Sequence, residues 1–129
     1  MAIDYAYRKV RLARHEGDGR GSLCVVENGD GVLPFRVERV FWITHIPEGG
    51  TRGGHLHKTQ WEALFAVSGS FDLLIESSGK LSRLRVSGAD EGVLIPPGTW
   101  SRLENFAPGT VCLALCDGPY DAAGYESRW

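Results

Sequence analysis

Two histidines one residue apart, followed by a glutamate, are the side chains of this sequence best suited to chemistry. Residues two apart in an extended segment point to the same face, so His55 and His57 can converge on one small volume. A turn over residues 58–60 would fold Glu62 back toward them. Imidazoles beside a carboxylate suit either metal ligation or proton transfer, and the spacing alone leaves both open.

The glycines around this group extend the pattern. The spacing of Gly49, His55, His57, Glu62 and Gly69 matches the first sequence signature of the cupin superfamily at every fixed position. The resemblance implies a small β-barrel with these side chains inside it. In a metal-dependent relative, His55, His57 and Glu62 would form a two-His, one-carboxylate triad for iron.

The second cupin signature is incomplete in this chain. Pro96, Gly98 and Asn105 are in place, but Asp90 replaces a glycine and Ser101 replaces a histidine. That histidine is a metal ligand in metal-dependent cupins, and a serine hydroxyl is a poor ligand for a divalent transition metal. The substitution favours proton transfer, while a dioxygenase-like metal enzyme remains an alternative.

The rest of the chain predicts strands that position these residues. Short β-rich runs alternate with turn residues, and no run has the pattern of a long amphipathic helix. The runs are SLCVV, FRVERVFWITHI, WEALFAV, SFDLLIES, KLSRLRVS, VLI and TVCLALC. This pattern predicts an all-β sandwich or barrel, and the cupin resemblance implies that it is an RmlC-like jelly roll. We expect one domain over residues 1–129, with loose ends at the first few residues and after about residue 120.

One predicted strand carries a charge on its apolar face. From Phe35 to Ile43 the odd positions are apolar except for Arg39. An inward arginine needs an anionic partner, because burying it unpaired is costly. The partner is either an inward carboxylate such as Glu62 or a bound ligand.

Composition narrows the partners and the compartment. The chain has 129 residues and a formal net charge of −2, which favours neither a nucleic acid nor a membrane surface as a partner. No apolar run approaches the roughly 20 residues of a membrane span. Cys24, Cys112 and Cys116 have no disulfide or zinc-site spacing. We expect a cytoplasmic protein.

Over nearly its whole length, the chain resembles the sugar 3,4-ketoisomerases, small cupins related to the WxcM-like group and to the 3,5-epimerases of dTDP-4-keto-6-deoxyglucose. The matching segments are RGSL (20–23), EN (27–28), PF (34–35), RVF (39–41), RGGHLHK (52–58), GSF (69–71), PPGTW (96–100), NF (105–106) and YD (120–121). The resemblance implies isomerisation of a dTDP-4-keto-6-deoxyhexose to its 3-keto isomer in deoxysugar biosynthesis, with no metal and no other cofactor.

The same resemblance implies roles for individual residues. His55 or His57 would be the acid/base, and Arg20, Arg39 and Arg52 would hold the diphosphate of the nucleotide sugar.

Two aromatic residues are candidates for the rest of the ligand. Trp100 would contact a thymine or sugar face, although packing at the barrel rim explains it equally well. Tyr120 would contact substrate and is a candidate replacement for the tyrosine hydroxyl that many family members carry at the position of Phe41.

The resemblance also implies a homodimer, in which the N-terminal strands up to Arg20 cross to the partner. Apolar Trp42 and Trp61 exceed what one small core needs and favour such an interface. A non-catalytic cupin that binds a nucleotide sugar remains a further alternative. The sequence leaves open which histidine is the base, the configuration of the product at C4, and the identity of the nucleotide.

Overall fold

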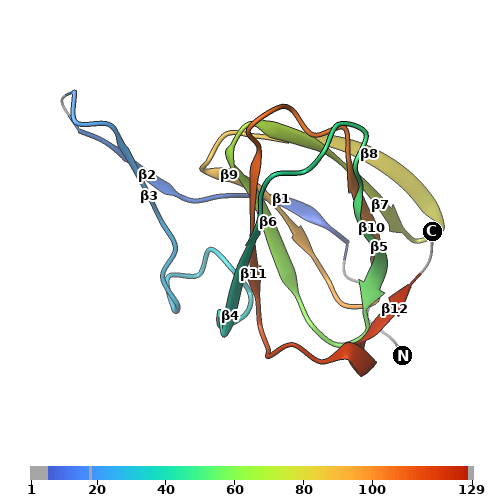
Figure 1. The fold of residues 1–129 in the computed structure, drawn as a ribbon. Coiled ribbons are helices and arrows are strands. Elements are labelled where there is room, and N and C mark those ends of the chain that lie inside the picture. Colours follow the sequence, from blue (N-terminus) through green and yellow to red (C-terminus); the bar gives the residue numbers. More distant parts are fainter. Residues whose placement is uncertain (1–5, 18, 128–129) are drawn as a thin grey trace.

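Two five-stranded antiparallel sheets form the body of the protein in a computed structural model that describes residues 6–17 and 19–127 (Figure 1). The first sheet has the order β1-β9-β6-β11-β4. Its strands are β1 (Arg8–Arg11), β9 (Glu91–Ile95), β6 (Glu62–Ser68), β11 (Val111–Cys116) and β4 (Arg39–Ile43).

The second sheet faces the first and has the order β12-β5-β10-β7-β8. Its strands are β12 (Tyr125–Ser127), β5 (Arg52–His57), β10 (Trp100–Glu104), β7 (Ser70–Ser77) and β8 (Lys80–Ser87). The predicted cupin jelly roll is confirmed.

Strict alternation along the central strands builds the core between the sheets. Leu64 of β6 faces Phe71 and Leu73 of β7, all essentially inaccessible to solvent. The intervening Phe65 points to the other side of the first sheet, where the N-terminal strand and residues 24–37 cover it. The first sheet is therefore apolar on both faces, which explains the nearly continuous burial of β6.

The strand predicted over FRVERVFWITHI (residues 35–46) is shorter than expected at both ends. Strand β4 begins at Arg39, and the apolar side chains on either side of that point belong to different clusters. Phe35 packs on the outside of the first sheet, whereas Phe41 packs between the sheets. The Asn28 side chain accepts a hydrogen bond from the Val37 amide, so a side chain replaces a strand partner there.

A short hairpin projects from the barrel (Figure 1). Strands β2 (Ala13–Glu16) and β3 (Ser22–Val25) pair only with each other, and Arg20 lies in the exposed turn between them. Arg14 holds the hairpin to the barrel through Asp90.

The expectation of a loose tail after residue 120 is wrong for the part of the tail that the structure describes. The 3-10 helix η1 (Ala122–Gly124) leads into β12, which pairs with β5. Asp121 caps η1 by accepting the Ala123 amide, and the Lys58 amide donates to the Gly124 carbonyl. Residues 1–5, the other predicted loose end, lie outside the described residues. No helix in the described part of the chain is long and apolar enough to cross a membrane.

Candidate active site

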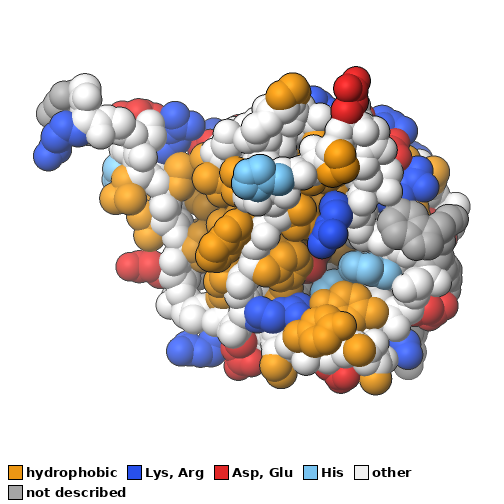
Figure 2. Space-filling model, in the orientation of Figure 1, with side chains coloured by type: hydrophobic (Ala, Val, Ile, Leu, Met, Phe, Trp, Pro, Cys, Tyr) orange, Lys and Arg blue, Asp and Glu red, His pale blue; other side chains and the backbone are white. Residues whose placement is uncertain are grey.

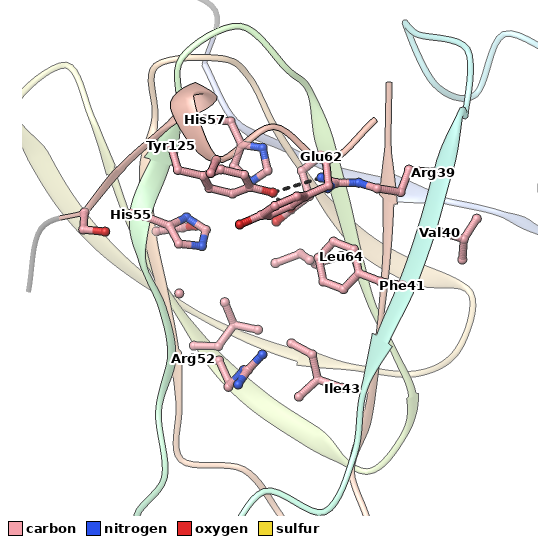
Figure 3. A pocket seen from close by; sticks show the side chains of 16 residues that line it. Arg39, Val40, Phe41, Ile43, Arg52, His55, His57, Glu62, Leu64 and Tyr125 are labelled. Atoms are coloured by element: carbon pink, nitrogen blue, oxygen red, sulfur yellow. Dashed lines mark hydrogen bonds and ion pairs between the residues drawn. The ribbon is translucent and has the colours of Figure 1, made fainter. Parts of the chain in front are cut away.

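A cavity of about 690 Å³ lies between the two sheets (Figure 3). Its wall on the second sheet carries the histidines, and its wall on the first sheet carries Arg39 and Glu62. The side chains that line it belong to Arg39, Val40, Phe41, Ile43, Arg52, His55, His57, Glu62, Leu64, Ser101, Leu103, Tyr120, Ala122, Tyr125 and Ser127, with Gly53.

Strand register places the histidines side by side on the second sheet. His57 lies opposite Tyr125 of β12, and His55 lies between Ser127 of β12 and Ser101 of β10. The Gly98 amide of the Pro-x-Gly turn donates to the His57 carbonyl at 2.7 Å, which fixes the end of β5. The incomplete second cupin motif thus still anchors the first one.

Three polar residues form a row across the opposite sheet. Cys116 of β11 lies between Arg39 of β4 and Glu62 of β6 in the strand register. Burial raises the pKa of the Cys116 thiol to about 11. The thiol therefore stays protonated and donates to Glu62 Oε2 over 3.7 Å.

Arg39 makes no salt bridge to Glu62 or to any other carboxylate in the described residues. Its guanidinium donates to the Tyr125 hydroxyl at 3.0 Å and lies 5.8 Å from the centre of the Tyr120 ring and 5.5 Å from that of Phe41. Of the two partners that the sequence left open for this inward arginine, the carboxylate is therefore not present among the described residues.

Tyr125 connects the two walls of the cavity. Its ring centre lies 4.4 Å from that of His57 and 4.9 Å from that of His55, while its hydroxyl points to Arg39 (Figure 3). The two imidazole centres are 5.4 Å apart.

His57 and Glu62 meet across the cavity. His57 Nε2 lies 3.1 Å from Glu62 Oε2, a close contact without the angles of a hydrogen bond. His55 Nδ1 and Arg39 Nε are also buried without a hydrogen-bond partner among the described residues. Buried polar atoms are normally paired, so the cavity retains hydrogen-bonding capacity that suits a polar ligand.

The surroundings shift the proton affinities of two groups. Burial lowers the pKa of His55 below 6.5, helped by the nearby His57 and opposed by Glu62, so its imidazole is neutral at pH 7. Burial raises the pKa of Tyr125 above 10, opposed by the hydrogen bond from Arg39. The cavity thus pairs a neutral base with a protonated phenol.

The residues present do not fit the iron site of the metal-dependent alternative. No three His, Cys, Asp or Glu side chains within residues 6–17 and 19–127 are arranged to hold a metal ion. Glu62 contacts His57 directly, and Ser101 occupies the cavity wall beside His55.

The structure brings together five of the seven site residues named from the sequence. His55, His57, Arg39, Arg52 and Tyr120 line the cavity, as does Glu62.

The other two named residues lie elsewhere. Arg20 is at the tip of the projecting hairpin, and Trp100 is half-buried with its ring 6.0 Å from the Arg102 guanidinium. Neither lines the cavity of its own chain.

Sequence reasoning missed Tyr125 and Ser127. The only sequence signal for these two residues was their two-residue spacing in the tail, and a run of three residues is too short to predict a strand.

A jelly-roll barrel with paired histidines in the cavity between its sheets is a cupin. The chain belongs to the WxcM-like family, because the family described as "FdtA: WxcM-like, C-terminal" matches residues 6–128. It is 26% identical over 112 residues to the TDP-4-oxo-6-deoxy-alpha-D-glucose-3,4-oxoisomerase of Aneurinibacillus thermoaerophilus, covering 87% of this chain and 80% of that protein.

Solved structures of similar proteins agree. The sugar 3,4-ketoisomerase QdtA of Thermoanaerobacterium thermosaccharolyticum, crystallised with TDP, superimposes with a TM-score of 0.89 at 26% identity, covering 97% of this chain and 90% of that one. The TDP-quinovose 3,4-ketoisomerase WlaRB of Campylobacter jejuni has a TM-score of 0.85 at 31% identity, covering 92% and 90%.

Proposed function

We propose that this protein is a metal-free nucleotide-sugar 3,4-ketoisomerase, which converts a dTDP-4-keto-6-deoxyhexose to its 3-keto isomer in deoxysugar biosynthesis. The observation that carries the proposal is the convergence of His55, His57 and the Tyr125–Arg39 pair in one cavity. The family and the activities named for its relatives support it.

The reaction needs a base that removes the C3 proton and returns a proton to C4. We assign this role to His55, because its imidazole is half-buried, neutral at pH 7 and part of the cavity wall. His57 lies on the same cavity wall and contacts the Glu62 carboxylate, a position that suits it to hydrogen-bond the enediol oxygens.

Arg52 suits the diphosphate of the ligand, whereas Arg39, which is hydrogen-bonded to Tyr125, suits negative charge that develops nearer the reacting sugar. Arg52 is exposed and lines the cavity, and Arg39 lies on the opposite wall without a carboxylate partner in the described residues (Figure 3). A diphosphate matches guanidinium donors in both charge and geometry. The Tyr120 ring lies against Arg39, so Tyr120 is placed to contact the ligand at the Arg39 end of the cavity.

Binding and metal dependence can be tested together. If the proposal is right, dTDP raises the melting temperature in the presence of a chelator, because a ligand of the folded state stabilises it without a metal. Elemental analysis should then find less than one transition-metal ion per chain. A shift that disappears with the chelator and returns with one added metal would instead establish the metal-dependent alternative.

We also propose a cytoplasmic homodimer in which the projecting hairpin docks on a second copy. Leu23 of the hairpin and Trp42 of the barrel are 61% and 65% exposed, and docking on a second copy would cover this apolar surface. Figure 2 shows hydrophobic side chains gathered between the hairpin and the barrel body. The free cysteines are consistent with a reducing compartment.

A further inference from the structure

We propose that Tyr125 is a catalytic residue that carries the proton between the two sugar oxygens, while Arg39 stabilises its phenolate. This inference rests on the proposed ketoisomerase function. It assigns a residue to the proton transfer between the two sugar oxygens, which a single histidine acting at carbon does not perform.

The chemistry requires two kinds of proton transfer. Loss of the C3 proton to the base turns the C4 carbonyl into an enolate, and protonation of O4 then gives the enediol. In the second half the O3 hydroxyl loses its proton, the C3 carbonyl forms, and C4 takes a proton from the base. The proton count balances if one group first gives a proton to O4 and then takes one from O3.

Tyr125 has the properties that this group needs. Burial keeps the phenol protonated before the reaction, so it can donate to O4. The resulting phenolate would lie 3.0 Å from the Arg39 guanidinium, whose positive charge stabilises it until the O3 proton arrives.

The place of Tyr125 in the fold supports the same role. Its strand pairs with β5 in a register that puts it beside His57, and its ring contacts both imidazoles. The phenol therefore lies within the group of side chains that must surround the reacting carbons. The pairing of β12 and the hydrogen bonds of η1 fix this position, so Tyr125 does not lie on a free tail.

The other hydroxyls of the cavity are less suitable. Tyr120 is 70% exposed and contacts Arg39 through its ring face. Ser101 and Ser127 are aliphatic alcohols, which are far weaker acids than a phenol. Phe41 has no hydroxyl at all, so Tyr125 is the only phenol among the described residues lining the cavity that is at least half-buried.

The test separates proton exchange at C3 from formation of the 3-keto isomer. Tyr125→Phe keeps the ring and removes the hydroxyl. Tyr7→Phe removes the hydroxyl of a residue that packs against the core and does not line the cavity. Both variants and the wild-type protein are incubated with dTDP-4-keto-6-deoxyglucose in heavy water. Deuterium at C3 and the 3-keto product are followed by NMR, and dTDP binding is measured to confirm folding.

We expect Tyr125→Phe to lower isomer formation at least about tenfold more than C3 exchange, because the enolate still forms but is reprotonated at C3. Tyr7→Phe should match the wild type in both rates. Equal losses of the two rates in Tyr125→Phe, or no loss, would overturn the inference and leave Tyr125 a structural role. A wild-type protein that binds dTDP but shows neither reaction would instead refute the proposed function.

Discussion

At the scale of the residue, the sequence could locate the two histidines but not Tyr125, whose ring contacts them. His55 and His57 follow from the two-residue period of a strand, and Glu62 from a turn of three residues. Tyr125 reaches the same cavity from a strand of only three residues at the end of the chain, and its position depends on long-range pairing with β5. Local patterns hold no information about such pairing.

Substitutions of His55 and Arg52 should affect turnover and dTDP binding differently. His55→Asn keeps the size of the side chain but removes its titrating nitrogen, so we expect turnover to fall at least about a hundredfold with dTDP affinity nearly intact. Arg52→Ala removes a cation of the cavity and should chiefly weaken dTDP binding. Single-turnover rates and calorimetric affinities measure the two effects. A similar loss of dTDP affinity in both variants would contradict these roles.

The pH profile should report the environment of His55. A base works only when neutral, so kcat/KM should rise with pH, reach a plateau, and have its acidic midpoint below 6.5, because burial lowers the pKa of His55. The unfolded chain binds that proton more readily than the folded one, so stability should also decline as pH falls below 6.5. A midpoint above 6.5 that disappears in His55→Asn would contradict the assignment.

At the scale of the element, the long strands were predictable from local pattern, whereas β1, β2 and β12 were not. The runs that became β6, β7 and β8 are long and β-rich, whereas β1, β2 and β12 have four residues or fewer and contain charged residues. The false extension of β4 toward Phe35 had a related cause. Apolar alternation continues through a segment that packs on the outside of the sheet instead of within it.

Close contact between strands β6 and β9 of the first sheet leaves no room for a side chain at Gly92. A methyl group on Gly92 of β9 would lie 2.5 Å from the Leu64 carbonyl oxygen and against the Phe65 ring, where the strand backbone cannot move away. We expect Gly92→Ala to destabilise the fold by about 1–3 kcal/mol in urea unfolding.

Gly124→Ala is the matched control for this substitution. The added methyl group would meet its nearest atom at 3.9 Å, so we expect a change within about 0.5 kcal/mol. Equal stability of the two variants would show that β6 and β9 are less closely packed than described.

At the scale of the whole molecule, the proposed dimer gives Arg20 a function that its own chain does not. Arg20 lies in the exposed turn of the hairpin and does not line the cavity of its own chain. If the hairpin docks on a second copy, Arg20 would serve the cavity of the partner. Light scattering should then find a dimer, and Arg20→Ala should weaken dTDP binding.

Co-expression of two defective chains tests this sharing. A heterodimer of Arg20→Ala and His55→Asn would contain one cavity with both residues intact. Random pairing should therefore restore about a quarter of wild-type turnover at low substrate, although each variant alone is impaired. No gain over the separate variants, with a dimer confirmed by light scattering, would place Arg20 outside the partner's cavity.

The central claim is that the paired histidines move a carbonyl from C4 to C3 of a nucleotide sugar. The most direct measurement is NMR of dTDP-4-keto-6-deoxyglucose incubated with the wild-type protein and a chelator in heavy water. We predict deuterium at C3 of the 4-keto sugar together with formation of the 3-keto isomer. Both should be lost or strongly reduced in His55→Asn. Unlabelled, unconverted substrate after prolonged incubation with folded protein that binds dTDP would contradict the claim and leave a nucleotide-sugar-binding cupin in its place.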